Sequence, residues 1–151
     1  MSKYAFGVDV GGTTVKLGLF NDKGQVLDKW EIPTVKDNGG EKVLPDIAAS
    51  IKNKMQEKNI SVEELVGVGI GAPGAVDADG YMVNGAVNIG WGAFDLAETL
   101  KKELDPNLMT VIATSRLTIK SERPHTINKF TLIFLFNTCG DSTSCSHSIT
   151  E

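Results

Sequence analysis

The hydrophobic and polar positions at the start of the chain alternate in the pattern of strands. Residues 4–10 and 15–20 are mainly apolar and flank a polar turn of two glycines and two threonines. This pattern predicts two antiparallel strands joined by a tight hairpin. Residues 25–33 alternate apolar and polar side chains and predict a third antiparallel strand.

A helical pattern follows these strands, after an expected loop at residues 37–40. Apolar residues recur at the spacing of a core-facing helical stripe at Val43, Ile47, Ile51 and Met55. Pro45 fits only the first turn of a helix, so the helix is expected to start near residues 41–44. Residues 61–64 match a capping box and predict one short helical turn.

Further strands and a second helix are predicted after this turn. Residues 65–71 are uniformly apolar apart from glycines, which is typical of a buried strand that returns parallel to the sheet. Residues 95–104 predict a helix with Asp95 as its N-cap and a buried stripe of leucines. Residues 109–113 predict one more strand.

Composition limits the class of protein. A hydrophobic content of 41% and a charged content of 23% are ordinary for a globular domain, and the formal net charge of −4 argues against the basic face that nucleic-acid binding needs. No signal peptide and no apolar run of membrane-spanning length is visible, so a cytoplasmic protein is expected. Cys139 and Cys145 are too few for a zinc site and are expected to be free thiols.

The turn of the first hairpin has the residue types of a phosphate-binding loop. Paired glycines permit positive φ and expose backbone N–H groups, and the hydroxyls of Thr13 and Thr14 add donors. Asp9, at the end of the first strand, would be repelled by a phosphate, so its expected role is to hold Mg²⁺ or a metal-bound water. The structural alternative is an ordinary hairpin turn.

Two other motifs have weaker functional readings. Residues 69–74 spell G-x-G-x-x-G, but a dinucleotide site needs a helix to open at the third glycine, and residues 75–83 predict a hairpin instead. Asp77 and Asp79 lack the further ligands of a calcium loop and are interpreted as turn residues.

Three segments together resemble a known family. Residues 9–18 (DVGGTTVKLG) resemble the first phosphate loop of the ROK family of sugar kinases, within the actin, Hsp70 and hexokinase superfamily. Residues 69–77 (GIGAPGAVD) and 88–91 (NIGW) resemble the two sugar-side loops of that family, in the same order. The resemblance covers about residues 3–109 and implies an α/β, actin-like (ribonuclease H-like) N-terminal lobe, with a mixed sheet and helices on its faces.

The resemblance also implies an activity, which is ATP-dependent phosphorylation of glucose at its 6-hydroxyl with Mg²⁺. It assigns residues to the nucleotide and its metal, namely Asp9, Gly11, Gly12, Thr13, Thr14 and Lys16. It assigns others to the sugar, namely Gly71, Pro73, Gly74 and Asn88. The structural alternatives are a solvent-facing Lys16, a local turn-forming role for Asn88, and a packing role for Trp91 rather than a sugar platform.

Other functions stay open at this stage. Fructose, mannose or N-acetylglucosamine could replace glucose, and the intact enzyme of this family type can be a homo-oligomer. The family also contains transcriptional repressors, but their DNA-binding helices would precede the first strand, which here begins at Tyr4. A non-catalytic sugar- or nucleotide-binding fragment is a further alternative.

The C-terminal part departs from the family pattern. The family's general base is an aspartate in a Glu-Asn-Asp-Ala-Asn stretch, whereas here Ala113, Thr114, Ser115 and Arg116 follow the last predicted strand. No catalytic residue is therefore identified. Residues 1–112 are expected to form the lobe, and residues 113–151 a divergent Ser/Thr-rich tail that is disordered or foreign to the family.

Overall fold

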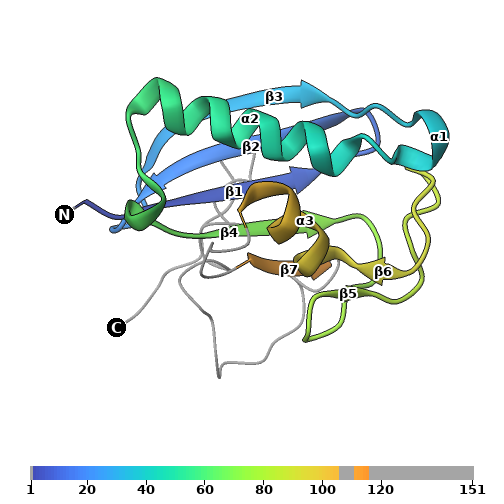
Figure 1. The fold of residues 1–151 in the computed structure, drawn as a ribbon. Helices are drawn as coiled ribbons and strands as arrows, with labels where there is room; N and C mark the ends of the chain where they lie inside the picture. Colours follow the sequence, from blue (N-terminus) through green and yellow to red (C-terminus); the bar gives the residue numbers. More distant parts are fainter. Residues whose placement is uncertain (1, 106–110, 116–151) are drawn as a thin grey trace, which may run out of the picture.

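The computed structural model describes residues 2–105 and 111–115, which form a mixed five-stranded sheet with helices on one side. The strand order is β3-β2-β1-β4-β7. The strands are β1 (Tyr4–Val10), β2 (Thr14–Asn21), β3 (Val26–Pro33), β4 (Leu65–Ala72) and β7 (Val111–Ser115). β1, β2 and β3 pair antiparallel, whereas β4 and β7 continue the sheet in parallel with β1 (Figure 1). This is the predicted mixed α/β architecture.

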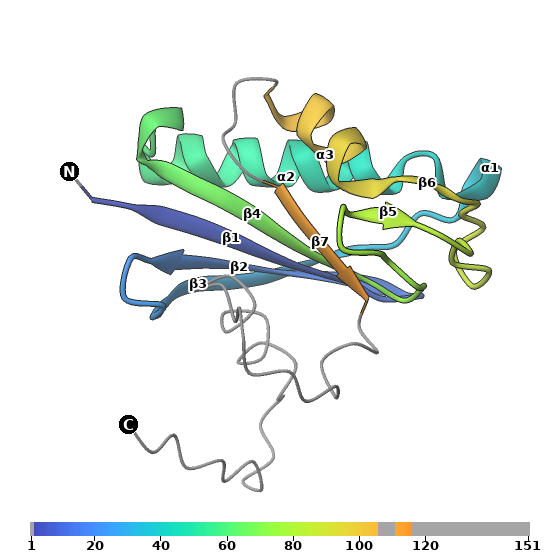
Figure 2. The ribbon, with the colours of Figure 1, turned by 90° about the horizontal axis from the view of Figure 1, so that it is seen from below.

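The helices lie along one face of the sheet, as Figure 2 shows for α2 and α3. They are α1 (Asp37–Gly40), α2 (Val43–Lys58), the 3-10 turn η1 (Val62–Glu64) and α3 (Leu96–Leu104). A separate two-stranded ribbon of β5 (Tyr81–Met82) and β6 (Phe94–Asp95) lies between β4 and α3 along the chain. None of the helices in the described ranges is long and apolar enough to cross a membrane.

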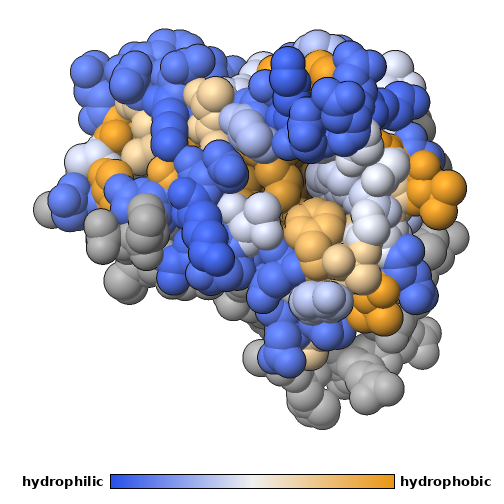
Figure 3. Space-filling model, turned by 45° about the vertical axis from the view of Figure 1, so that its right-hand side comes forward, coloured by the Kyte–Doolittle hydropathy of each residue, from blue (hydrophilic) through white to orange (hydrophobic). Residues whose placement is uncertain are grey.

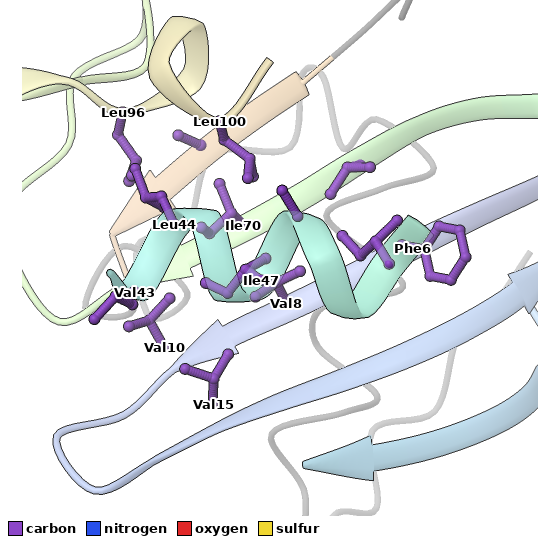
Figure 4. Close-up of a cluster of buried hydrophobic side chains, with 14 of the residues drawn as sticks. Phe6, Val8, Val10, Val15, Val43, Leu44, Ile47, Ile70, Leu96 and Leu100 are labelled. Atoms are coloured by element: carbon purple, nitrogen blue, oxygen red, sulfur yellow. The ribbon is translucent and has the colours of Figure 1, made fainter. Parts of the chain in front are cut away.

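The core lies between the sheet and these helices (Figure 4). Side chains alternate across a strand, so Phe6, Val8 and Val10 all point toward α2, where Ile47 and Ile51 are fully buried. Burying a side chain of this size stabilises the fold by roughly 1.5–3 kcal/mol relative to leaving it in water. Burial of these side chains is therefore the physical reason that the strands keep this register and present this face to α2.

A set of polar contacts joins α2 to β3 at the margin of the core. The indole N–H of Trp30 donates to Ser50 Oγ at 2.8 Å, and Lys54 Nζ lies 4.9 Å from the Trp30 ring centroid. Lys54 also pairs with Asp28 at 3.0 Å. The hydrogen bond from Lys54 holds the pKa of the Asp28 carboxyl below the ordinary value of 3.8, against the opposing effect of desolvation.

The local predictions for the helices are confirmed. The helix α2 starts at Val43, with Pro45 in its first turn, and the capping box is present because the Ser61 N–H donates to Glu64 Oε2 at 3.0 Å. Asp95 is the N-cap of α3, where its Oδ1 accepts a hydrogen bond from the Glu98 N–H at 2.9 Å.

The structure differs from the sequence predictions at three places. Residues 37–40 (α1), expected as a loop, form a turn closed by a hydrogen bond from the Gly40 N–H to Lys36 O, and its backbone is not that of a regular helix, since Asn38 and Gly39 have left-handed φ values of 51° and 73°. β5 lies in the hairpin predicted over residues 75–83, where Val76 bridges Met82, but its pairing with β6 was not predicted, since two-residue strands leave no periodic signal. The last strand, β7, covers Val111–Ser115 rather than the predicted residues 109–113. The cysteines and the expected tail beyond Ser115 lie outside the described residues.

Candidate functional site

The predicted ligand-binding segments gather at one edge of the sheet. β1 and β4 are parallel, so their carboxyl ends meet at the same edge, which is the usual location of ligand sites in such sheets. The turn after β1 (residues 11–13) lies there, and the chain that leaves β4 returns there as the Asn88 loop (residues 84–92) (Figure 1). Segments far apart in the sequence are thereby brought together.

Hydrogen bonds to its carbonyl oxygens hold the 11–13 turn. Thr34, directly after β3, donates its hydroxyl to Gly11 O at 2.8 Å and its backbone N–H to Thr13 O at 2.8 Å. The Gly11 N–H closes the turn on Thr14 O at 3.0 Å. Three carbonyl oxygens that would repel a phosphate are thus engaged by protein donors, as a turn that offers N–H groups to an anion requires.

Thr34 is a site residue that sequence reasoning missed. It is 8% exposed and bonds a residue 23 positions away, so no local pattern could have indicated it. Its hydroxyl and amide together fix the conformation of the turn from one side. Thr13, by contrast, is exposed and Thr14 is half-buried, so the hydroxyl groups predicted to bind phosphate lie at the surface.

Gly11 and Gly12 do not use the positive φ that glycine permits, because neither is among the residues with left-handed backbone. Glycine is needed at these positions because neighbouring atoms leave little room for a side chain. A Cβ atom on Gly11 would lie 2.6 Å from Thr14 O, closer than real atoms approach. A Cβ atom on Gly12 would lie 3.2 Å from the side-chain Nδ2 of Asn88. The turn and the Asn88 loop are therefore in contact.

Asp9 is next to the last residue of β1, on the sheet face opposite the helices, because Val8 and Val10 face the core. It is 8% exposed and is paired in register with Lys16 on β2 and Gly71 on β4. Lys16 is exposed, in agreement with the solvent-facing alternative. Asp9 and Lys16 therefore place one carboxylate and one ammonium group beside the 11–13 turn.

The residues present fit a Mg²⁺-nucleotide group rather than a metal cage. In the described part of the chain, no group of three or more His, Cys, Asp or Glu side chains could hold a metal ion. Mg²⁺ commonly keeps several waters and takes only one or two protein carboxylates together with substrate phosphates. A single buried carboxylate next to a turn with engaged carbonyls suits that mode of binding.

The sugar-side glycines have structural roles. Gly71 is buried in β4 opposite Asp9. A Cβ atom on Gly74 would lie 2.2 Å from Gly85 O, so Gly74 is needed for contact between two backbone segments of the protein itself. Pro73 is half-buried between these two glycines. Whether this segment also contacts a ligand stays a prediction.

Asn88 is exposed at the tip of a closed loop. Ala86 and Trp91 exchange backbone hydrogen bonds at 3.0 and 3.1 Å, and the N–H groups of Ile89 and Gly90 both donate to Ala86 O. The loop therefore does not depend on the Asn88 side chain for its shape, which leaves that amide available for a ligand. Val87, beside it, is 93% exposed, and Figure 3 shows hydrophobic residues scattered among hydrophilic ones on this side of the molecule.

The dinucleotide and calcium alternatives fail on geometry. No helix opens at Gly74, because the chain turns into β5. Asp77 Oδ1 accepts hydrogen bonds from the N–H groups of Asp79 and Tyr81 at 3.0 and 2.9 Å, so it is used to close the turn around Gly80. Trp91 is 8% exposed, so the prediction that it packs in the protein is confirmed.

Comparison with known proteins finds sequences similar to this chain. The model of the ROK family matches residues 5–114. The chain is 41% identical over 101 residues to a glucokinase of Halalkalibacterium halodurans, covering 67% of this chain and 31% of that protein. It is 36% identical over 97 residues to a glucokinase of Thermotoga maritima, covering 64% of this chain and 29% of that protein.

Solved structures agree on the fold. A ROK family glucokinase from Streptomyces griseus, in complex with glucose and AMPPNP, superimposes with a TM-score of 0.61 at 24% identity. The superposition covers 77% of this chain and 34% of that protein. The chain therefore spans about a third of the length of the relatives that it matches.

Proposed function

The chain belongs to the ROK family, and we propose that it forms the N-terminal portion of a kinase that transfers the γ-phosphoryl group of ATP to the 6-hydroxyl of glucose. The observation that supports this best is the contact between Asn88 and Gly12. It sets a side chain able to bind hydroxyl groups directly beside a turn suited to phosphate. Transfer between two substrates requires such proximity, because the acceptor must lie next to the phosphoryl group.

The 11–13 turn has the properties of a phosphate cradle. Thr34 holds the carbonyl oxygens of Gly11 and Thr13, so the turn presents its N–H groups other than that of Gly11, together with the Thr13 and Thr14 hydroxyls, to the phosphate oxygens. Asp9 would hold Mg²⁺, directly or through water, and the bound ion would supply neutralisation of the charge on the phosphates. Lys16 is exposed and contributes at most a long-range positive charge.

Asn88 orients the sugar. Its amide has both a donor and an acceptor group, which matches the two capacities of a sugar hydroxyl. Gly74 packs against Gly85, so the 71–74 segment contacts the Asn88 loop. We propose glucose as the sugar, since both glucokinases are similar over nearly the whole lobe. The same activity would supply sugar phosphate for glycolysis in the cytoplasm.

The 151-residue chain by itself is proposed to be inactive. β7 ends at the same edge as the site, with Ala72 paired to Ser115, but the chain there reads Ala113-Thr114-Ser115 and offers no carboxylate to accept the hydroxyl proton. Loss of general-base help typically costs 10²–10⁴ in rate. The second lobe that would close over the substrates, align them and exclude water is also not part of this chain's match.

A chimaera provides the test. Residues 1–115 replace the corresponding portion of the Halalkalibacterium halodurans glucokinase, and ADP release is measured with glucose, fructose, mannose and N-acetylglucosamine. Turnover is expected with glucose, and none with the 151-residue chain alone. A folded chimaera that releases ADP with no sugar, while the parent glucokinase is active, would overturn the proposal. If the chimaera prefers another sugar, the proposed kinase activity stands and that sugar replaces glucose as its proposed substrate.

A further inference from the structure

The Asn88 loop is attached to the turn that precedes α2 through backbone contact. Gly39, Gly40 and Gly90 have φ values of 73°, 71° and 91°, which side chains rarely adopt. A Cβ atom on Gly90 would lie 2.9 Å from Gly39 Cα, and one on Gly40 would lie 2.8 Å from Ile89 O. Glycine is therefore required on both sides of this contact, where the backbones of the two segments approach closely and the side chains of Ile89 and Trp91 also lie against Gly40.

A buried hydrogen bond fixes the two segments in register. The indole Nε1–H of Trp91 donates to Gly40 O at 3.0 Å. The Trp91 ring also packs edge-on against Phe94, with the ring centroids 5.4 Å apart. A bond between two groups removed from water is directional and costly to break, because breaking it leaves a buried donor and acceptor unpaired. Trp91 therefore has one defined orientation.

We propose that Trp91 is a positioning residue for Asn88. By tying the Asn88 loop to Gly40, it holds the Asn88 side chain over Gly12 without touching a substrate itself. The effect on sugar binding rests on the proposed function, in which Asn88 contacts the sugar, whereas the structural effect does not. Without the indole bond, the loop can shift relative to the 11–13 turn, and Asn88 loses its fixed place.

The structural effect can be measured in the 151-residue chain without a ligand. A nuclear Overhauser contact between the Asn88 side-chain amide protons and the Gly12 α-protons is expected in the unmodified chain. Trp91→Phe keeps an aromatic ring but removes the N–H, and the contact is expected to disappear. Trp30→Phe is the matched control, because it also removes an indole hydrogen bond, to Ser50 on α2, but far from this loop. There the contact is expected to persist.

A second variant covers the case in which Trp91→Phe does not fold. Benzothienylalanine introduced at position 91 preserves the bicyclic shape and replaces the N–H with sulfur. The same loss of the Asn88–Gly12 contact is expected. Persistence of that contact in either folded variant would overturn the proposal, since the loop would then be held without the indole bond.

The functional effect is measured in the chimaeric kinase. Trp91→Phe is expected to raise the KM for glucose about three- to tenfold, with the KM for ATP unchanged. Equal changes in both KM values would overturn the positioning role. An inactive but folded unmodified chimaera would count against the proposed function alone, because the Overhauser measurement would still decide the role of Trp91.

Discussion

The side-chain Nδ2 of Asn88 lies so close to Gly12 that a Cβ atom there would be only 3.2 Å away. This is tighter than ordinary van der Waals contact, so any side chain at Gly12 displaces Asn88 by a few tenths of an ångström. A residue assigned to phosphate therefore limits the position of a residue assigned to sugar. A change in the phosphate part of the proposed site is therefore expected to move a side chain in its sugar part through this contact.

Gly12→Ala should impair glucose use although it lies in the phosphate turn. Gly12 does not have positive φ, so alanine fits the backbone and the fold should be retained. In the chimaeric kinase we expect a rise of about two- to tenfold in the KM for glucose. Gly92→Ala is the control, because a Cβ atom at Gly92 meets nothing within 4 Å. An unchanged glucose KM in Gly12→Ala would contradict the coupling.

Asn88→Ala should weaken sugar use more than nucleotide use. Removing one hydrogen bond to a neutral hydroxyl costs about 0.5–1.5 kcal/mol, and more if a buried group is left unpaired. The KM values for glucose and ATP are compared, together with the double variant Gly12→Ala/Asn88→Ala. The two substitutions should be non-additive, since both act on the same side chain. Equal shifts in the two KM values would count against a sugar contact.

Asp9→Ala should abolish catalysis while the lobe remains folded. Asp9 lies on the sheet face opposite the main core, so its loss removes no core packing, but the Mg²⁺-side carboxylate is gone. Thermal unfolding checks the fold, and steady-state kinetics check turnover. A variant that keeps kcat within about tenfold, or roughly 1.4 kcal/mol of barrier, would show that Asp9 is not essential.

Thr34→Val should loosen the phosphate turn. Valine keeps the branched shape and the backbone N–H bond to Thr13 O, and removes only the hydroxyl that donates to Gly11 O at 2.8 Å. We expect a loss of about 1 kcal/mol in unfolding free energy and a higher KM for ATP. Thr34→Ser, which retains the hydroxyl, should restore both values. A KM for ATP that is the same in all three proteins would exclude this role.

Asp28→Asn should reduce stability at neutral pH and not in acid. The folded-state pKa of Asp28 is lowered from 3.8 by its hydrogen bond to Lys54, so its stabilising effect is present above the unfolded pKa and lost as the pH falls through the folded value. Because the pair is partly exposed, about 0.2–1 kcal/mol is expected. Melting temperatures at pH 7 should differ and should converge below about pH 4. A constant difference across this range would point to packing instead.

The sequence by itself determined the main strands and the helices α2 and α3 of this protein. The apolar residues at Val8 and Val10, the stripe that begins at Val43, and the cap at Asp95 are local patterns, and each one depends only on residues within a few positions. The order of antiparallel and then parallel strands follows from the lengths of the connections between them. The family resemblance rests on the same local segments.

Only the tertiary structure decided how the candidate site is built. Thr34 on Gly11, Trp91 on Gly40 and Asn88 against Gly12 each join residues that are far apart in the chain. The neighbour of Gly12 was also hidden, because a Cβ atom at Gly12 would meet Asn88 Nδ2, which comes from elsewhere in the fold, whereas one at Gly11 would meet Thr14 O within the same turn. Contacts of this kind depend on how the sheet and loops pack, which local periodicity does not specify.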